Sequence, residues 1–234
     1  MSPVTVHDLI AALPEPDVLA ARCRAFAVLD AVFDSGYPTY SHTAEWAPKV
    51  ALAEMSNGSG DLYAIVFEPA GVFLYGFDHE SEATPWRDDD REHWPGLLEG
   101  VPDSLVRWTR EPAFLFAGFF DATVCAWRET DDTQWRCGPV EFDEASRDPD
   151  GADHLFGTLV AGTATAYADY ARDYFECDID VDAVATILDG RPLTAAVVAA
   201  LNPDAAFTEV AKAAIAAGYP VEAAGYPAEP EVRS

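Results

Sequence analysis

A predicted β-hairpin in residues 62–77 constrains the fold of this chain more than any other feature. Two runs of apolar, β-branched and aromatic residues, 62–67 and 72–77, flank the turn sequence Glu68-Pro69-Ala70-Gly71. A symmetric turn predicts the cross-strand pairs Phe67 with Val72, Ile65 with Leu74, and Tyr63 with Gly76. A hairpin of this kind needs further strands or a helix to cover it, so it predicts an antiparallel sheet.

A second hairpin is predicted further along the chain. Strands at residues 123–128 and 134–142 are joined by a turn at 129–133, and another strand-like run precedes them at 114–120. With a five-residue loop, the predicted register places Cys125 opposite Cys137 and Trp127 opposite Trp135.

Helices are predicted on both sides of these hairpins. Apolar residues recur at spacings of three and four in residues 16–33, and again from residue 153 to about residue 175. Three short helices follow, at residues 182–188, 194–201 and 204–217, each ended by Gly or Asn-Pro. This order predicts an α+β domain over residues 1–218, with a central antiparallel sheet built from hairpins, an N-terminal helix and a C-terminal helical segment. Residues 219–234 are expected to be an extended tail.

The chain is strongly acidic, with 41 Asp and Glu against 14 Lys and Arg and a formal net charge of -27. Such a surface repels phosphate groups and anionic lipids, so we expect no direct binding to nucleic acid or membranes. It favours a basic protein or a cation as the partner. The simpler alternative is that the charge serves only solubility.

The cysteines indicate a reducing compartment. Cys23, Cys125, Cys137 and Cys177 are widely spaced and form no Cys-x-x-Cys motif. The start of the chain lacks the positive region of a secretory signal, and no apolar run approaches the ~18 residues of a membrane helix. We therefore expect a bacterial cytoplasmic protein with reduced thiols.

The candidate catalytic residues are Asp78, His79 and Glu80, which follow the second strand of the first hairpin. They supply acid, base and metal-ligand atoms, but on a regular strand the middle residue points to the opposite face. If the strand breaks here, the group could bind a divalent ion, and His42 and His93 are weaker candidates for completing such a site. The alternative is a structural latch at the exit of the hairpin. No established metal, nucleophile or phosphate-binding motif is present, so we expect no cofactor.

A second group of candidate residues lies in the proline-rich connection after the first hairpin. Trp86 and Trp94 flank the acidic run Asp88-Asp89-Asp90. Aromatic side chains rimmed by charge are typical of recognition surfaces. The alternative is that the two indoles fasten a long loop onto the core.

Three segments resemble a set of uncharacterised bacterial proteins. They are Gly76-Phe77-Asp78-His79-Glu80-Ser81, Trp94-Pro95-Gly96 and the hairpin that carries Trp127 and Trp135. This resemblance brings no activity or cofactor with it. In size and acidity the chain is also similar to immunity proteins of bacterial toxin systems, which implies a basic toxin domain as partner. The leading hypothesis is therefore an acidic binding protein, and the alternative is a small metal-assisted hydrolase that uses Asp78, His79 and Glu80.

Overall fold

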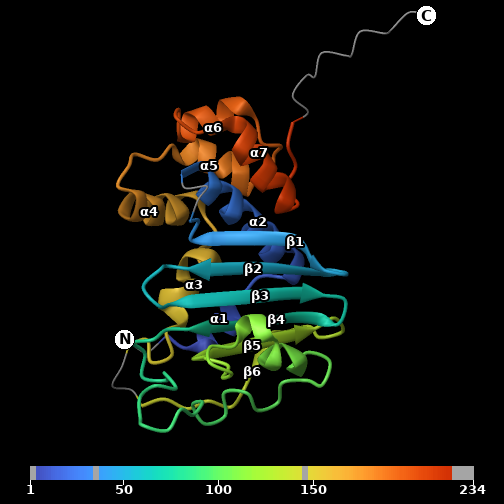
Figure 1. Cartoon of the computed structure of the whole chain (residues 1–234), viewed down its shortest axis with the longest axis vertical. Helices are drawn as coiled ribbons and strands as arrows, with labels where there is room; N and C mark the ends of the chain where they lie inside the picture. Colours follow the sequence, from blue (N-terminus) through green and yellow to red (C-terminus); the bar gives the residue numbers. More distant parts are fainter. Residues whose placement is uncertain (1–3, 34–36, 144–146, 223–234) are drawn as a thin grey trace, which may run out of the picture.

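The computed structural model describes residues 4–33, 37–143 and 147–222, which form an α+β fold around one antiparallel sheet (Figure 1). Six strands are hydrogen-bonded in chain order, so the sheet is a meander. Their bounds are Tyr40–Ala47 (β1), Val50–Ser56 (β2), Leu62–Glu68 (β3), Gly71–Phe77 (β4), Val124–Glu129 (β5) and Arg136–Cys137 (β6). The predicted fold class is confirmed.

The β3–β4 hairpin has the predicted register. Phe67 pairs with Val72, Ile65 with Leu74, and Tyr63 with Gly76. The hairpin lies in the middle of the sheet, because β2 pairs with the outer edge of β3 and β5 with the outer edge of β4. Strands β1 and β2 extend this sheet on the N-terminal side beyond the predicted hairpins.

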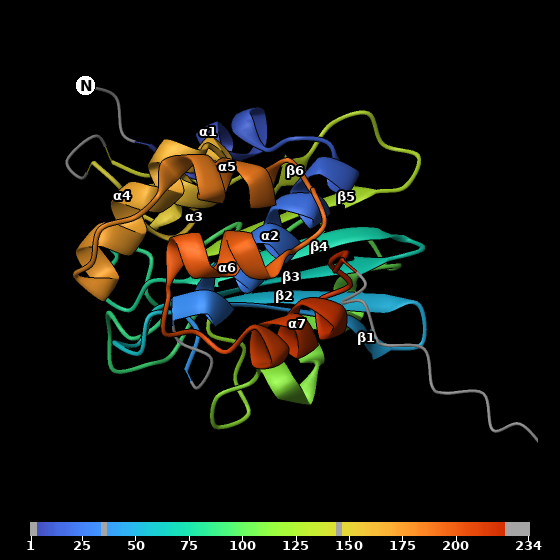
Figure 2. The same ribbon diagram turned by 90° about the horizontal axis from the view of Figure 1, so that it is seen from above.

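The described residues form seven α-helices, and those before and just after the sheet cover one of its faces (Figure 2). Their bounds are Val6–Ala12 (α1), Pro16–Phe33 (α2), Ala152–Ala161 (α3), Ala164–Phe175 (α4), Val181–Leu188 (α5), Ala195–Leu201 (α6) and Phe207–Ala216 (α7). The predicted bounds of α2 are confirmed. None of these helices combines the length and apolar character needed to cross a lipid bilayer.

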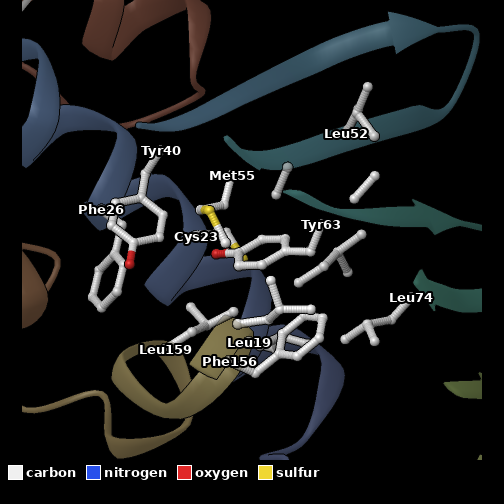
Figure 3. Close-up of a cluster of buried hydrophobic side chains, with 14 of the residues drawn as sticks. Leu19, Cys23, Phe26, Tyr40, Leu52, Met55, Tyr63, Leu74, Phe156 and Leu159 are labelled. Atoms are coloured by element: carbon white, nitrogen blue, oxygen red, sulfur yellow. The ribbon is translucent and has the colours of Figure 1, made fainter. Parts of the chain in front are cut away.

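The main core lies between this helical layer and the sheet (Figure 3). Tyr63 of β3 stacks on Phe156 of α3, with 4.7 Å between ring centroids. Gly76 of β4 allows this close approach, because a Cβ there would lie 2.7 Å from Cδ1 of Leu155 and 2.9 Å from Cε2 of Phe156. The glycine at this strand position therefore sets how closely α3 packs on the sheet.

The opposite face of the sheet is covered by the connection between β4 and β5. This connection contains two short 3₁₀ helices, Val106–Arg110 (η1) and Pro112–Phe114 (η2). Tyr75 of β4 contacts the rings of Phe114 and Phe120, at centroid distances of 5.3 and 4.6 Å. Residues 114–120 were expected to form a strand, which is wrong. They hold the end of η2 and an isolated bridge between Phe116 and Phe119 instead.

The predicted long helix ending near Phe175 is two helices. Gly162 adopts a left-handed conformation with φ 57° and ends α3, and Thr163 caps the N-terminus of α4. Arg22 of α2 occupies the space beside the break, where Nη1 donates to the carbonyl oxygens of Leu159 and Val160. Partners for the last carbonyls of α3 thus come from another helix, which local periodicity does not reveal.

The register predicted for the second hairpin is wrong by one residue. Cys137 pairs with Ala126, not with Cys125, and β6 has only two residues. Trp135 donates its indole N–H to the carbonyl oxygen of Pro14, 2.8 Å away, and this contact with the α1–α2 connection draws it out of the ladder. A shift of one residue turns the side chains to the opposite face, so Cys137 Sγ lies 3.4 Å from His7 Nδ1. All four cysteines carry free thiols.

The C-terminal part of the described chain belongs to the fold. The three short helices occur where they were expected, as α5, α6 and α7. Tyr219 was assigned to an extended tail, but it is buried, and its hydroxyl lies 2.7 Å from the carbonyl oxygens of both Ile187 and Arg191, to either of which it can donate. Leu193 forms a parallel bridge with Val221. Residues 223–234 of the expected tail lie outside the described residues.

Candidate functional site

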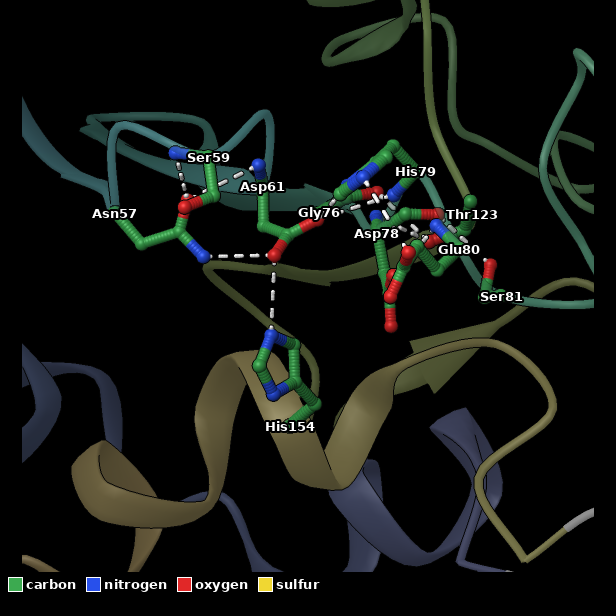
Figure 4. Close-up of polar contacts among 10 residues, drawn as sticks. All are labelled: Asn57, Ser59, Asp61, Gly76, Asp78, His79, Glu80, Ser81, Thr123 and His154. Atoms are coloured by element: carbon green, nitrogen blue, oxygen red, sulfur yellow. Dashed lines mark hydrogen bonds and ion pairs between the residues drawn. The ribbon is translucent and has the colours of Figure 1, made fainter.

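The candidate site lies where β3 begins and β4 ends (Figure 4). Leu62 pairs with Phe77 at this edge of the hairpin, so Asp61 and Asp78 continue the two strands side by side. An open hollow of about 800 Å³ is found here, and we call it the acidic hollow. Its ionisable lining residues are Asp61, Asp78, His79, Glu80, Glu82, Asp148 and His154.

The carboxylate of Asp61 connects the segments that form the acidic hollow. Its Oδ1 accepts from the backbone N–H of His79 at 3.1 Å and lies 2.7 Å from His79 Nδ1. Its Oδ2 accepts from Asn57 Nδ2 at 2.7 Å and lies 3.2 Å from His154 Nε2. One buried carboxylate therefore joins the β2–β3 loop, the end of β4 and the first turn of α3.

These contacts determine the protonation states in the site. Burial alone would raise the pKa of Asp61, but the hydrogen bonds from His79, Asn57 and His154 outweigh it and lower the pKa to about 2. The same carboxylate raises the pKa of His79, chiefly by accepting its hydrogen bond. Asp61 is therefore an anion at neutral pH.

The strand β4 ends directly after Phe77. Asp78 and His79 can lie on the same side only if the strand ends here, because successive side chains of a regular strand point to opposite faces. Asp78 Oδ1 accepts from the backbone N–H of Glu80 at 2.9 Å, and Ser81 Oγ donates to the Asp78 carbonyl at 2.9 Å. This turn places Asp78 and His79 on the same side as Asp61, and ligand atoms of the three residues lie within 4.8 Å of one another. Glu80 is not part of this group. Its side chain is 86% exposed, and its Oε1 lies 4.0 Å from His79 Nε2, not beside the Nδ1 that contacts Asp61.

The N-terminus of α3 forms another wall of the acidic hollow. Asp148 accepts from the backbone N–H groups of Asp153 and His154, at 3.1 and 2.8 Å. Gly151, with φ 78°, lies against Asp78, and a Cβ at this position would be 2.6 Å from Asp78 Oδ2. A side chain at residue 151 would thus push Asp78 away from the helix.

An apolar hollow of about 620 Å³ adjoins the acidic hollow, and His79 lines both. We call it the aromatic hollow, and its large apolar lining residues are Leu62, Tyr75, Phe77, Trp86, Phe114, Leu115 and Phe116. Trp86 and Phe116 stand at its rim, with exposed fractions of 52% and 64%. The Arg91 guanidinium lies 4.1 Å from the Trp86 ring centroid and is ion-paired with Asp121.

The other predicted binding residues fall into two groups. Asp88, Asp89 and Asp90 are exposed in the loop that follows Trp86. Trp94 is half-buried, since it stacks on Phe142 at 5.2 Å and donates its indole N–H to the carbonyl oxygen of Glu141. Trp94 therefore fastens the connection to the domain, while Trp86 is available at the surface.

The two weaker metal candidates lie elsewhere. His42 is in β1, which β2 separates from β3, and it is buried on the helical side of the sheet near Arg24. Burial, and then the charge of Arg24, lower its pKa to about 4. His93 stacks on Phe119, and its Nε2 lies 2.6 Å from the carbonyl oxygen of Phe120. Within the described part of the chain, neither histidine belongs to the group formed by Asp61, Asp78 and His79.

Sequence reasoning missed Asp61, Asp148 and His154. Asp61 could have been predicted, because one more step of the predicted hairpin register beyond Leu62 and Phe77 brings it beside Asp78. The other two come from the turn before α3 and from its first turn, far from the hairpin in sequence. Only the packing of α3 on β4 brings them to the site.

Comparisons with protein-family models, with curated proteins and with solved structures found no match for this chain.

Proposed function

We propose that this chain is an acidic binding protein of the bacterial cytoplasm, of the immunity type, whose partner is a basic protein. The observation that carries the proposal is the pair of adjoining hollows, one acidic and one aromatic, that share His79. A partner segment with a Lys or Arg beside an apolar side chain would fill both. Charge steers the encounter, and a buried apolar anchor supplies most of the binding energy.

The aromatic anchor differs in part from the one the sequence indicates. Trp86 and Phe116 are the exposed aromatic residues at the rim of the aromatic hollow, and their centroids are 6.4 Å apart. Asp88, Asp89 and Asp90 provide charge close to this rim. Trp94 is excluded from the proposed anchor because its indole already packs on Phe142.

The hydroxyl group near His79 is not arranged for nucleophilic catalysis by serine. Ser81 is buried, and its Oγ donates to the Asp78 carbonyl oxygen. A nucleophilic serine would instead be hydrogen-bonded to the imidazole that activates it. This arrangement does not bear on a metal-assisted hydrolase, which would use metal-bound water in place of a serine and is kept as the second hypothesis.

An immunity role predicts that a basic protein is encoded beside the gene, and the test measures association of the purified full chain with that protein. We expect Trp86→Ala to speed dissociation at least ~10-fold with little effect on the association rate. Ile215→Ala is the matched control, because Ile215 is a 66% exposed apolar residue of α7 outside both hollows. The association rate should fall steeply between low and physiological salt.

Two outcomes would contradict the proposed function. One is binding that Trp86→Ala and Phe116→Ala leave unchanged. The other is an association rate that is insensitive to salt.

A further inference from the structure

We propose that Asp61, Asp78 and His79 form a binding site for a divalent transition-metal ion of the zinc and manganese class. The site lies in the acidic hollow, so a bound ion and a Lys or Arg of the proposed partner would compete for it, but the test below uses the metal alone and needs no partner. Each residue offers one ligand atom, and these atoms lie within 4.8 Å of one another. Ligands of a tetrahedral ion at ~2.0–2.2 Å lie about 3.5 Å apart, so small side-chain movements bring all three into range.

The donor set matches this class of ion. One imidazole nitrogen and two carboxylates suit zinc or manganese, whereas calcium and magnesium prefer oxygen ligands alone. Three protein ligands also leave a coordination position for water or for a group from a bound molecule. The opening of the acidic hollow gives solvent access to that position.

The central ligand is held in place by groups that do not take part in coordination. Asn57 Nδ2 and His154 Nε2 contact Asp61 Oδ2, at 2.7 and 3.2 Å, and Oδ1 faces His79. Contacts of this kind orient a ligating carboxylate and increase metal affinity. His154 is therefore a positioning residue for Asp61.

Two glycines make room for the other two ligands. At Gly60, with φ 116°, a Cβ would lie 3.3 Å from His79 Nδ1, and at Gly151, with φ 78°, one would lie 2.6 Å from Asp78 Oδ2. Gly60 lies in the β2–β3 loop and Gly151 directly before α3. The backbone thus forms a cradle in which side chains at either position would displace a proposed ligand.

The ion takes the place of a proton. In the hydrogen-bonded form, His79 Nδ1 and Asp61 Oδ1 share a proton across 2.7 Å. On metal binding the Nδ1–H bond breaks and a bond from Nδ1 to the metal forms. A ring protonated on both nitrogens releases the Nδ1 proton to solvent and keeps Nε2–H, and a neutral ring carries its proton on Nε2 instead. The ion also offsets repulsion among the carboxylates that line the hollow.

The test titrates the full chain, stripped with a chelator, with manganese chloride alone. Manganese is the probe because it binds thiolates weakly, which removes the free cysteines from consideration. Electron paramagnetic resonance of free manganese and calorimetry give stoichiometry and affinity. We expect one equivalent bound, with at least ~10-fold weaker binding for His79→Ala and for Asp78→Asn.

Two further variants separate coordination from general effects. His154→Ala should weaken binding ~10-fold or more without abolishing it. His93→Ala should bind as wild type, because that imidazole contacts the Phe120 carbonyl oxygen outside the hollow. Far-ultraviolet circular dichroism identifies any variant that fails to fold, and Asp78→Asn decides the question if His79→Ala does not fold. Absence of a stoichiometric site, or equal affinity in wild type and Asp78→Asn, overturns the proposal.

Discussion

At the scale of single residues, the Asp61 carboxylate is the side chain that connects the segments of the site. It accepts hydrogen bonds from three segments of the chain while buried. We predict that Asp61→Asn lowers the free energy of unfolding by about 1–3 kcal/mol. The amide that replaces the carboxylate has only one acceptor oxygen, so its NH₂ group would face hydrogen-bond donors that are left without an acceptor. Urea denaturation with chelator present measures this effect without any contribution from metal. Asp204→Asn, on an exposed residue, is the control, and equal stability losses in the two variants would contradict the role given to Asp61.

His42 gives the second prediction at this scale. Its pKa falls from 6.5 to about 4 on folding, because burial and the Arg24 charge disfavour the imidazolium ion. The unfolded chain then binds more protons between these values, so His42 lowers stability as the pH falls from 6.5 to 4 and has no such effect above 6.5. We expect this contribution to reach about 2–3 kcal/mol at pH 4.

The measurement compares the pH dependence of unfolding in wild type and in His42→Leu. The remaining titratable groups are common to both proteins and cancel in the difference. The variant should therefore lose less stability than wild type from pH 7 to pH 4. If the two curves run parallel, folding does not lower the pKa of His42, and the prediction is wrong.

At the scale of secondary-structure elements, the contact between β4 and α3 decides the site geometry, because α3 carries His154 and begins next to Asp78. We predict that Gly76→Ala lowers the free energy of unfolding by about 1–3 kcal/mol, since its Cβ would lie within 3 Å of Leu155 and Phe156. Gly157→Ala in α3 is the matched control. Its Cβ would meet only the Asp153 carboxylate, so it should be neutral or stabilising by about 0.5–1 kcal/mol. The reverse order of stabilities would refute the packing argument.

At the scale of the whole molecule, the net charge of -27 produces self-repulsion that salt screens. We predict that raising sodium chloride from 20 mM to 500 mM increases the Tm by a few degrees. Scanning calorimetry over this range tests the prediction, with 1 M glucose as a control for effects that do not depend on ionic strength. A falling Tm would mean that ion pairs such as Arg91–Asp121 outweigh the repulsion.

Residues that are close together in the chain encode the β3–β4 hairpin and the helix α2. The Glu68-Pro69-Ala70-Gly71 turn and the continuous apolar runs on either side of it encode the hairpin and its register, and three- and four-residue spacing encodes the helix. The position of His79 at the end of β4 follows from the same turn. These features depend on neighbours close in the chain, so a single sequence is enough to predict them.

Contacts between distant segments set the rest of the site and explain the features that were predicted incorrectly. Arg22 stabilises the break after α3, and Pro14 draws Trp135 out of the β5–β6 ladder, through contacts with residues more than 100 positions away. The contact between His154 and Asp61 likewise spans 93 residues. Contacts of this kind depend on how α1, α2 and α3 pack on the sheet, and neither hydrophobic periodicity nor turn chemistry carries that information.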